Sequence, residues 1–444
     1  MPNSNYGAIP AAALSGSLLD FRVPKGSDIL KRLEGFYTWQ NLRRQNGVWP
    51  YSRSTQSGPT ALCTAEDDSG SPMTGVNFAS QDYLSLSSHP DIMATAMEAV
   101  EEFGVHSAGS PAFLGNNRHS IALERKIADF LEMPEAVLFP TGWAAGYSVI
   151  RGLVRSADHI VIDALAHSCL QEGANAATRN IYLHRHLDLD HCRHWLQKIR
   201  AKDTENGIMV VTEGLFSMDS DSPDIAALQN LCNEYNATLM VDVAHDLGAL
   251  GDSGRGHIGI QKMLGKVDLV MGSFSKTFAS NGGFIACRNR AIKEYLRYYS
   301  PSATFSNALS PVQAAIVLKA FQIVGSAEGF ALRSELMRNI LDLRATLHAS
   351  GLEFYGDPSA IVAVKTGTEE LARLVSRRLP ELGLVANLVE YPAVRKGAAR
   401  FRMQVMAKHT RQNIADAVAR LHKAFTEATI EQAANRQPKR RAAA

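Results

Sequence analysis

The sequence predicts an α/β fold in which a mostly parallel sheet carries helices on both faces, with a smaller C-terminal α+β domain after it. Two observations lead to this prediction. From Val76 onward, short apolar and β-branched runs alternate with amphipathic helical stretches, which is the pattern of βαβ units. A chain of 444 residues is also long for a single hydrophobic core, so two or three domains are expected.

Residues 1–70 are expected to form an N-terminal arm. Gly, Pro and Ser interrupt this stretch, and its main helical pattern runs from Ile29 to Asn46. The alternation of strands and helices begins only after it. We therefore expect the arm to wrap around the larger body of the chain.

Residues 71–310 are expected to form the large domain. Its strand candidates are residues 136–139, 159–162, 208–212, 238–241, 267–271 and 283–287, with helix candidates such as 120–131 and 225–235 between them. Ligands of such sheets bind outside the carboxyl ends of the strands. The residues that directly follow each strand are therefore the place to look for chemistry.

Residues 311–430 are expected to form the small C-terminal domain. A long helical stretch from Pro311 to His348 opens it, and further strands and helices follow at 361–364, 369–379, 401–405 and 412–426. Residues 431–444 contain the basic run Pro438–Arg441 and are predicted to be a disordered solubilising tail.

The composition is that of an ordinary globular protein. Lys and Arg number 46 against 44 Asp and Glu, so charge gives no drive toward nucleic acid or membranes. No apolar run approaches the ~18 residues that an integral membrane segment needs. The five cysteines are scattered without a CxxC pair, which indicates neither a disulfide framework nor a zinc ribbon and fits a cytoplasmic protein.

Two strand ends carry groups that suggest a cofactor. Asp242 directly follows the apolar strand 238–241, and Lys276 follows the small, hydroxyl-rich turn after the next strand. An acid and a lysine so placed can bracket a cationic heterocycle, and pyridoxal 5′-phosphate (PLP) is the common one. Its pyridine nitrogen takes a carboxylate partner and its aldehyde forms a Schiff base with a lysine. A structural salt bridge is the alternative interpretation of the same pair.

Three further strand ends fit the same cofactor. After residue 139, a turn of small residues opens a helix at Gly142 and Trp143, where free backbone N–H groups suit a phosphate. The segment from Glu213 to Asp219 directly follows another strand. At a fifth strand end, His167 stands at the start of a helix. Together these strand ends predict a single PLP site.

Four histidines cluster at positions 184, 186, 191 and 194. We interpret them as a solvated turn and helix face, in which Asp188 or Asp190 caps the helix that follows, and we predict no metal site there.

The motifs at these strand ends resemble those of a known family. The segments TEGLFSMDSD, VDVAHDLGALGDSGRG, GSFSKTFASNGG and FSNALSPVQAA are similar to those of the PLP-dependent α-oxoamine synthases, which are fold-type I PLP enzymes. The resemblance covers about residues 45–428. The SKTFAS form and the N-terminal GVWPYSR are most similar to serine palmitoyltransferase-like enzymes.

The resemblance implies catalytic roles for three residues. Lys276 would form the Schiff base and exchange the substrate α-proton, Asp242 would keep the pyridine nitrogen protonated, and His167 would stack on the ring. It also implies that His245 and Ser217 hydrogen-bond the phenolate oxygen of the cofactor.

Further implied roles concern the phosphate and the amino acid. Gly142, Trp143 and Ser273 would hold the phosphate. Ser306 and Asn307 match the stretch that reaches the phosphate of a neighbouring subunit, which implies a homodimer with shared active sites. Arg402 would bind the substrate carboxylate. Gln81 stands near the substrate where the family usually has Asn, so it bears on the choice of amino acid.

The implied activity is a PLP-dependent acyl transfer. An L-amino acid would condense with an acyl thioester with loss of CO2, giving an α-aminoketone for lipid or secondary-metabolite synthesis. Long-chain acyl-CoA is the preferred donor and an acyl carrier protein the second. A fold-type I aminotransferase is one alternative, and a regulatory or partner subunit of a PLP-fold complex is another.

Overall fold

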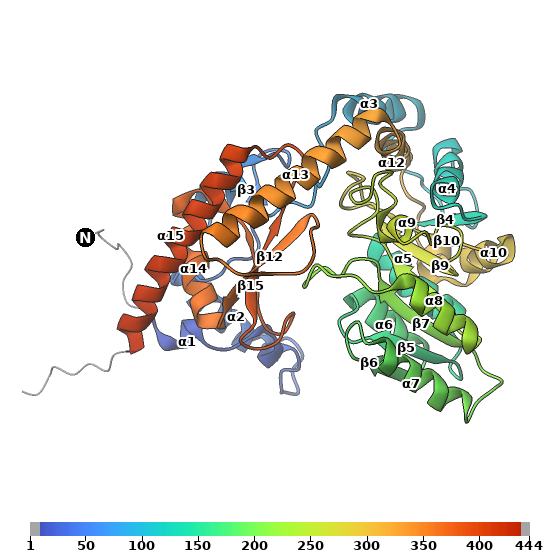
Figure 1. Cartoon of the computed structure of the whole chain (residues 1–444), viewed down its shortest axis with the longest axis horizontal. Helices are drawn as coiled ribbons and strands as arrows, with labels where there is room; N and C mark the ends of the chain where they lie inside the picture. The colour runs from blue at the N-terminus through green and yellow to red at the C-terminus, as the bar shows by residue number, and fades with distance from the viewer. Residues whose placement is uncertain (1–8, 437–444) are drawn as a thin grey trace, which may run out of the picture. The chain divides into compact units, whose positions relative to one another are not determined.

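Seven strands form the central sheet, in the order β4-β10-β9-β8-β7-β5-β6. The computed structural model describes residues 9–436 of the chain, and this sheet lies in one of two compact units, built from Gln81–Met337 (Figure 1). The strands are β4 (Glu135–Phe139), β5 (His159–Asp163), β6 (Ile181–His184), β7 (Ile208–Glu213), β8 (Thr238–Asp242), β9 (Leu269–Ser273) and β10 (Gly283–Cys287). Strand β10 runs antiparallel to both of its neighbours, and the other pairings are parallel.

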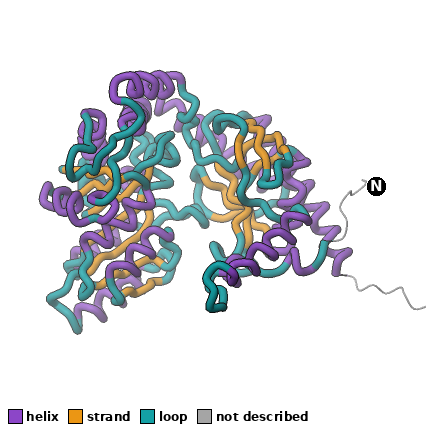
Figure 2. Tube along the Cα trace, turned by 180° about the vertical axis from the view of Figure 1, so that it is seen from behind, coloured by secondary structure: helices purple, strands orange, loops and turns teal. Residues whose placement is uncertain are grey.

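The predicted α/β fold with a mostly parallel sheet is confirmed. The strands are buried along most of their length because helices cover both faces (Figure 2). The helices that pack on the sheet include α4 (Arg118–Leu131), α5 (Gly142–Leu153), α7 (Leu189–Arg200) and α8 (Ile225–Glu234). Strand β6 was missed in the sequence because it lies at the sheet edge, where its side chains are mostly half-buried or exposed.

The predicted long helix 311–348 is two helices. Helix α12 (Pro311–Val324) ends at Gly325 and packs against α3 (Pro90–Phe103) and α4. Helix α13 (Ala327–Ala349) follows with a bend of 79°. The expected start of the small domain at residue 311 thus differs from the structure, since α12 packs within the sheet unit and the unit boundary falls inside α13.

Among residues 9–436, no single helix is both long enough and apolar enough to span a membrane. Helices α12 and α13 reach that length and apolarity only when they are taken together, and they are bent by 79° at the break between them.

The second unit contains residues 9–80 and 338–436. Two four-stranded sheets, ordered β1-β2-β3-β13 and β11-β12-β15-β14, pack with helices α14 (Glu369–Leu382) and α15 (Arg411–Arg436). Helix α2 (Glu34–Gln45) belongs to the same unit and contacts α1 (Ala11–Leu14). The strands are β1 (Ser54–Thr55), β2 (Leu62–Glu66), β3 (Pro72–Asn77), β11 (Phe354–Tyr355), β12 (Ile361–Gly367), β13 (Leu384–Val385), β14 (Asn387–Val389) and β15 (Ala399–Gln404).

The predicted arm and tail differ from the structure in this unit. Within residues 1–70, β1 and β2 are sheet strands, and β3 pairs in parallel with β13, so the start of the chain is integral to this unit rather than a separate arm. Helix α15 continues to Arg436, so the start of the predicted disordered tail is helical. Residues 437–444 lie outside the described part of the chain.

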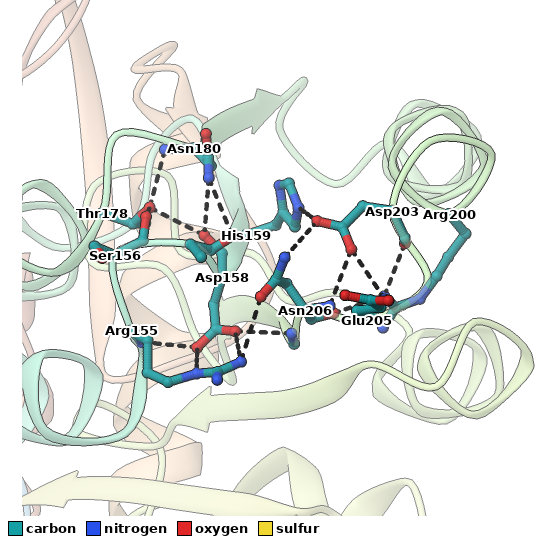
Figure 3. A network of polar contacts seen from close by, with 12 residues as sticks. Arg155, Ser156, Asp158, His159, Thr178, Asn180, Arg200, Asp203, Glu205 and Asn206 are labelled. Carbon is teal, nitrogen blue, oxygen red and sulfur yellow. Dashed lines mark hydrogen bonds and ion pairs between the residues drawn. The ribbon is translucent and has the colours of Figure 1, made fainter.

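A network of polar contacts lies at the N-terminal ends of β5 and β7 (Figure 3). Asp158 accepts hydrogen bonds from the Arg155 side chain and from the backbone N–H of Gly207. Beside it, His159 Nε2 lies 2.9 Å from Asp203 Oδ2. These contacts hold β5 and β7 together at their N-terminal ends, whereas the predicted site lies at the C-terminal ends of the strands.

Candidate active site

Three neighbouring strands end in polar residues at one edge of the sheet. Glu213, Asp242 and Ser273 are the last residues of β7, β8 and β9, and Lys276 follows three residues later. Glu213 is in register with Asp242 across the β7–β8 pair. Because these strands are parallel, their carboxyl ends meet at one edge. The structure therefore brings Asp242 and Lys276 to the same region.

The two carboxyl groups at this edge are buried. Burial raises the pKa of Asp242, and the charges of Lys276 and His167 oppose that rise. Burial and the neighbouring Asp242 raise the pKa of Glu213 well above its usual range. A buried carboxylate is costly without a cation or hydrogen-bond donors. A protonated pyridine nitrogen fits the requirement at Asp242.

His167 stands at the N-terminus of α6 (Ser168–Ala177) with an exposed ring. Its backbone N–H donates to Glu213 Oε1 at 2.6 Å. Its Nδ1 accepts from the backbone N–H of Cys169 at 3.3 Å and lies 3.0 Å from Cys169 Sγ. Since Nδ1 is an acceptor, the neutral ring carries its proton on Nε2. The orientation of the imidazole is thus set by the helix that it caps.

The N-terminus of α5 approaches Ser273 closely enough to require glycine. A Cβ atom added to Gly142 would lie 2.2 Å from Ser273 Oγ. Ser273 Oγ lies 2.7 Å from Ser275 Oγ, and Thr141 caps the helix by accepting from Ala144 N–H. The first backbone N–H groups of a helix have no intrahelical acceptor, so Gly142 and Trp143 with these hydroxyls suit a phosphate.

His245 has a partner that the sequence did not suggest. Its Nδ1 is hydrogen-bonded to Tyr83 Oη at 2.9 Å, and both residues are buried. Tyr83 lies two residues after Gln81, which is half-buried, and no pattern in the sequence links Tyr83 to His245, which is 162 residues away. Ser217 is buried in the loop after β7.

The remaining predicted residues lie outside this group. Ser306 and Asn307 follow α11 (Pro301–Thr304), where the Ser306 hydroxyl donates to Ser302 O and Asn307 Nδ2 lies 3.0 Å from His106 Nε2. Arg402 belongs to the other unit, on β15, and is buried. Arg400 shares its face of the strand, and its guanidinium lies 4.1 Å from the Tyr355 ring centroid.

The histidine cluster is only partly as predicted. Asp188 accepts from His191 N–H and is the residue that caps α7, as one of the two alternatives proposed. The solvated interpretation is wrong for His184, which is buried, and for His186, which is half-buried. Ligand atoms of His186, Asp219 and Asp221 lie within 4.8 Å of one another, and the absence of a metal there stays a prediction.

Comparison with known proteins shows which family the chain belongs to. The family model for class I and II aminotransferases matches residues 74–421. The 8-amino-7-oxononanoate synthases of Pectobacterium atrosepticum and Klebsiella pneumoniae are each 34% identical, over 79% and 78% of this chain and 88% of theirs. The chain belongs to the PLP-dependent α-oxoamine synthase family. The family resemblance and its cofactor, PLP, are thereby confirmed for this α-oxoamine synthase.

Solved structures agree with the fold of this α-oxoamine synthase. A serine palmitoyltransferase from S. paucimobilis, solved with PLP–myriocin, is 25% identical with a TM-score of 0.84, covering 91% of this chain and 100% of that one. The serine palmitoyltransferase of Sphingomonas wittichii has the same TM-score and coverage at 24% identity, and shows the fold alone.

Proposed function

We propose that this α-oxoamine synthase condenses an L-amino acid with a long-chain acyl-CoA, releasing CO2 and free thiol and forming an α-aminoketone. The observation that carries the proposal is that the buried Asp242 and the half-buried Lys276 lie together at the C-terminal ends of the strands. PLP, when bound, draws electrons from the α-carbon of the amino acid.

The roles of the protein groups follow from their positions. The Asp242 carboxylate would hold a proton on the pyridine nitrogen, and Lys276 Nζ would take the α-proton. His167 would cover one face of the ring, while His245 and Ser217 would donate to the phenolate oxygen. Gly142, Trp143 and Ser273 would bind the phosphate. Gly142 leaves no room for a Cβ next to Ser273, so the N-terminus of α5 and the Ser273 hydroxyl lie close enough to bind the same group.

The amino acid is expected to bind through its carboxylate. Arg402 is our choice for this contact because Arg400 is already stacked on Tyr355. A guanidinium binds a carboxylate bidentately, which fixes the bond that must break when CO2 leaves. We keep Gln81 as the residue that influences which amino acid is accepted.

The proposed donor rests on the likeness to serine palmitoyltransferases, whose name states a long acyl chain and serine. The 8-amino-7-oxononanoate synthases show that relatives also make shorter products. An acyl group on a carrier protein is the second donor to test. The five cysteines are free and buried, which supports a reducing compartment, and we assign the enzyme to the cytoplasm.

A homodimer with shared active sites is also proposed. Phe113, Leu114 and Phe305 expose 85%, 90% and 89% of their surface. The loop before Phe113 and the segment after α11 form one surface, because Ala308 N–H donates to Gly109 O and Ser110 Oγ to Thr304 O. Together these three exposed apolar side chains lie beside Ser306 and Asn307, which supports a subunit contact at these residues.

A matrix of amino acids against acyl-CoA chain lengths tests the activity. We expect stoichiometric release of thiol and CO2 for one amino acid with long-chain donors. Lys276→Ala is the control and should lose both turnover and the covalent attachment of PLP that borohydride traps. Formation of a keto acid without thiol release would contradict the proposal and indicate an aminotransferase.

A further inference from the structure

His186 joins the loops at the carboxyl ends of three adjacent strands. It follows β6, and its ring stands edge-on to Phe216 with centroids 4.5 Å apart. Its Nδ1 donates to Asp163 Oδ1 at 2.9 Å, and its Nε2 donates to Asp221 Oδ2 at 3.1 Å. Asp163 ends β5, and Asp221 lies in the loop after β7, so one imidazole connects strands β6, β5 and β7.

Asp163 fixes the loop that leads to His167. Its side chain is fully buried, and Oδ1 also accepts from Leu165 N–H at 2.8 Å. Its Oδ2 accepts from Leu187 N–H at 3.0 Å. The turn between β5 and α6 is therefore held by the same carboxylate that binds His186.

Asp221 fixes the loop that carries Ser217. Its backbone carbonyl accepts from Phe216 N–H at 2.9 Å, directly before Ser217. The His186 ring touches this loop twice, through the hydrogen bond to Asp221 and through Phe216.

The bridge that His186 forms between Asp163 and Asp221 carries charge. Burial disfavours the charged imidazole, but hydrogen bonds to two carboxylates outweigh it and raise the pKa of His186 to about 10. At neutral pH the ring is thus a cation between two anions, and hydrogen bonds of this kind are about twice as strong as neutral ones.

We infer that His186 is a positioning residue for the cofactor site, because its imidazolium holds the His167 loop and the Ser217 loop in a fixed relation. The inference rests on the proposed function, in which His167 and Ser217 contact PLP. His186 itself would touch neither cofactor nor substrate.

Two substitutions separate the halves of the bridge. In His186→Asn the amide nitrogen replaces Nδ1, which keeps the bond to Asp163 and loses the bond to Asp221. In His186→Gln it replaces Nε2, which keeps Asp221 and loses Asp163. We expect faster backbone hydrogen exchange at residues 214–221 in the Asn variant and at residues 164–167 in the Gln variant, measured on the cofactor-free protein.

His159→Asn is the matched control, because its amide nitrogen replaces Nδ1 and loses the contact that His159 Nε2 makes to Asp203. It removes a histidine–aspartate pair of similar length, 2.9 Å to Asp203, from the opposite end of the same strand β5 (Figure 3). We expect a comparable fall in melting temperature in all three variants. Only the His186 variants should bind added PLP more weakly, by roughly tenfold, and shift its visible absorbance, since one charged hydrogen bond is lost.

The outcomes are distinguishable. If the His186 variants lose stability but keep wild-type PLP affinity, absorbance and kcat, as His159→Asn should, the inference is overturned. If either variant cannot be recovered folded, Asp221→Asn gives the same comparison, because it weakens one side of the bridge and leaves His186 in place. Failure of the wild-type protein to bind PLP would instead count against the proposed function.

Discussion

Asp246 is a fully buried carboxyl group one residue beyond His245. Its Oδ2 accepts from His257 N–H at 2.7 Å, and Cβ atoms added to Gly214 and Gly256 would lie within 2.8 Å of that same oxygen. The two glycines therefore leave room for the carboxyl group next to the site. Burial, with a smaller contribution from Asp242, raises the pKa of Asp246 to about 7.

This shift predicts a pH-dependent stability. A carboxyl with a raised folded pKa contributes stability that is complete below its unfolded pKa of 3.8 and is lost as pH rises through about 7. Asp246→Asn has no charge to bury, so we expect it to be more stable than wild type at pH 8, by about 1–3 kcal/mol. Urea unfolding at pH 5.5 and 8.5 measures this. A difference that does not shrink toward pH 5.5 would refute the titration of Asp246.

Arg402 and Arg400 give a second test at single residues. Arg402→Ala should weaken binding of the amino acid by ~2–4 kcal/mol, because truncation leaves the substrate carboxylate without its cation. Arg400→Ala should change it less than threefold, since its guanidinium is stacked on Tyr355. Titrating both variants with glycine, alanine and serine and following the cofactor absorbance decides between them. The reverse result would mean that the substrate arginine is Arg400.

Single residues also show what a sequence can reveal. Asp242 and Lys276 can be predicted as a pair, and the structure brings them to one edge of the sheet, because a carboxylate ending an apolar strand and a lysine after a hydroxyl-rich turn are unusual in themselves. The bridge from His186 to Asp163 and Asp221 was missed, because its three residues come from three loops. Nothing in a linear pattern shows which loops meet.

Among the elements of the second unit, one acid joins two helices. Glu390 directly follows β14 and accepts from Arg43 of α2 at 3.3 Å and from Arg373 of α14 at 2.7 Å, with Tyr51 Oη at 3.1 Å. Arg373 also donates to the carbonyls of Leu14 and Gly16. All three charged side chains are almost completely buried. This cluster attaches residues near the start of the chain to helix α14.

Removing the Glu390 carboxylate should destabilise the second unit. Glu390→Ala leaves two buried guanidinium groups without their carboxylate, and we expect a loss of about 3–5 kcal/mol in the free energy of unfolding of this unit. Glu353→Ala, which removes the exposed pair with Lys365, is the control and should leave the urea midpoint unchanged. Equal midpoints for the two variants would show that the Glu390 cluster does not stabilise the unit.

Elements were predicted well where their pattern was self-contained. The six predicted strands of the sheet unit are all present, since strands covered on both faces are continuous apolar runs. The break between α12 and α13 was missed because the apolar pattern continues across Gly325, and a single glycine within a helical pattern is a weak signal.

At the scale of the whole molecule, the exposed apolar side chains of Phe113, Leu114 and Phe305 predict that two copies of the chain form a dimer. Phe305→Asp should convert a dimer into monomers, since a charge would replace a side chain expected to be buried between subunits. Sedimentation equilibrium measures the change, and activity should fall with the dimer fraction. Leu183→Asp, on the edge strand β6, is the control and should remain dimeric. A wild-type monomer with full activity would contradict the shared active site.

The overall organisation was the least predictable feature. Sequence order suggested an arm, a large domain and a small domain in succession, whereas residues 9–80 fold with residues 338–436. The pairing of β3 with β13 joins segments more than 300 residues apart, and two-residue strands such as β13 carry too little pattern to be recognised.

This discontinuous unit has a consequence for synthesis on the ribosome. Residues 81–337 have all of their strands once Met337 has emerged, but Arg43 is translated long before Glu390, and β3 long before β13. Residues 9–80 are therefore made long before these partners. Until β13 and Glu390 are translated, the edge of β3 is unpaired and the Arg43 guanidinium has no Glu390 carboxylate to bind. A premature stop near residue 380 would thus affect the beginning of the chain as well as the C-terminus: β3 would lose its partner strand β13, and Arg43 would lose Glu390.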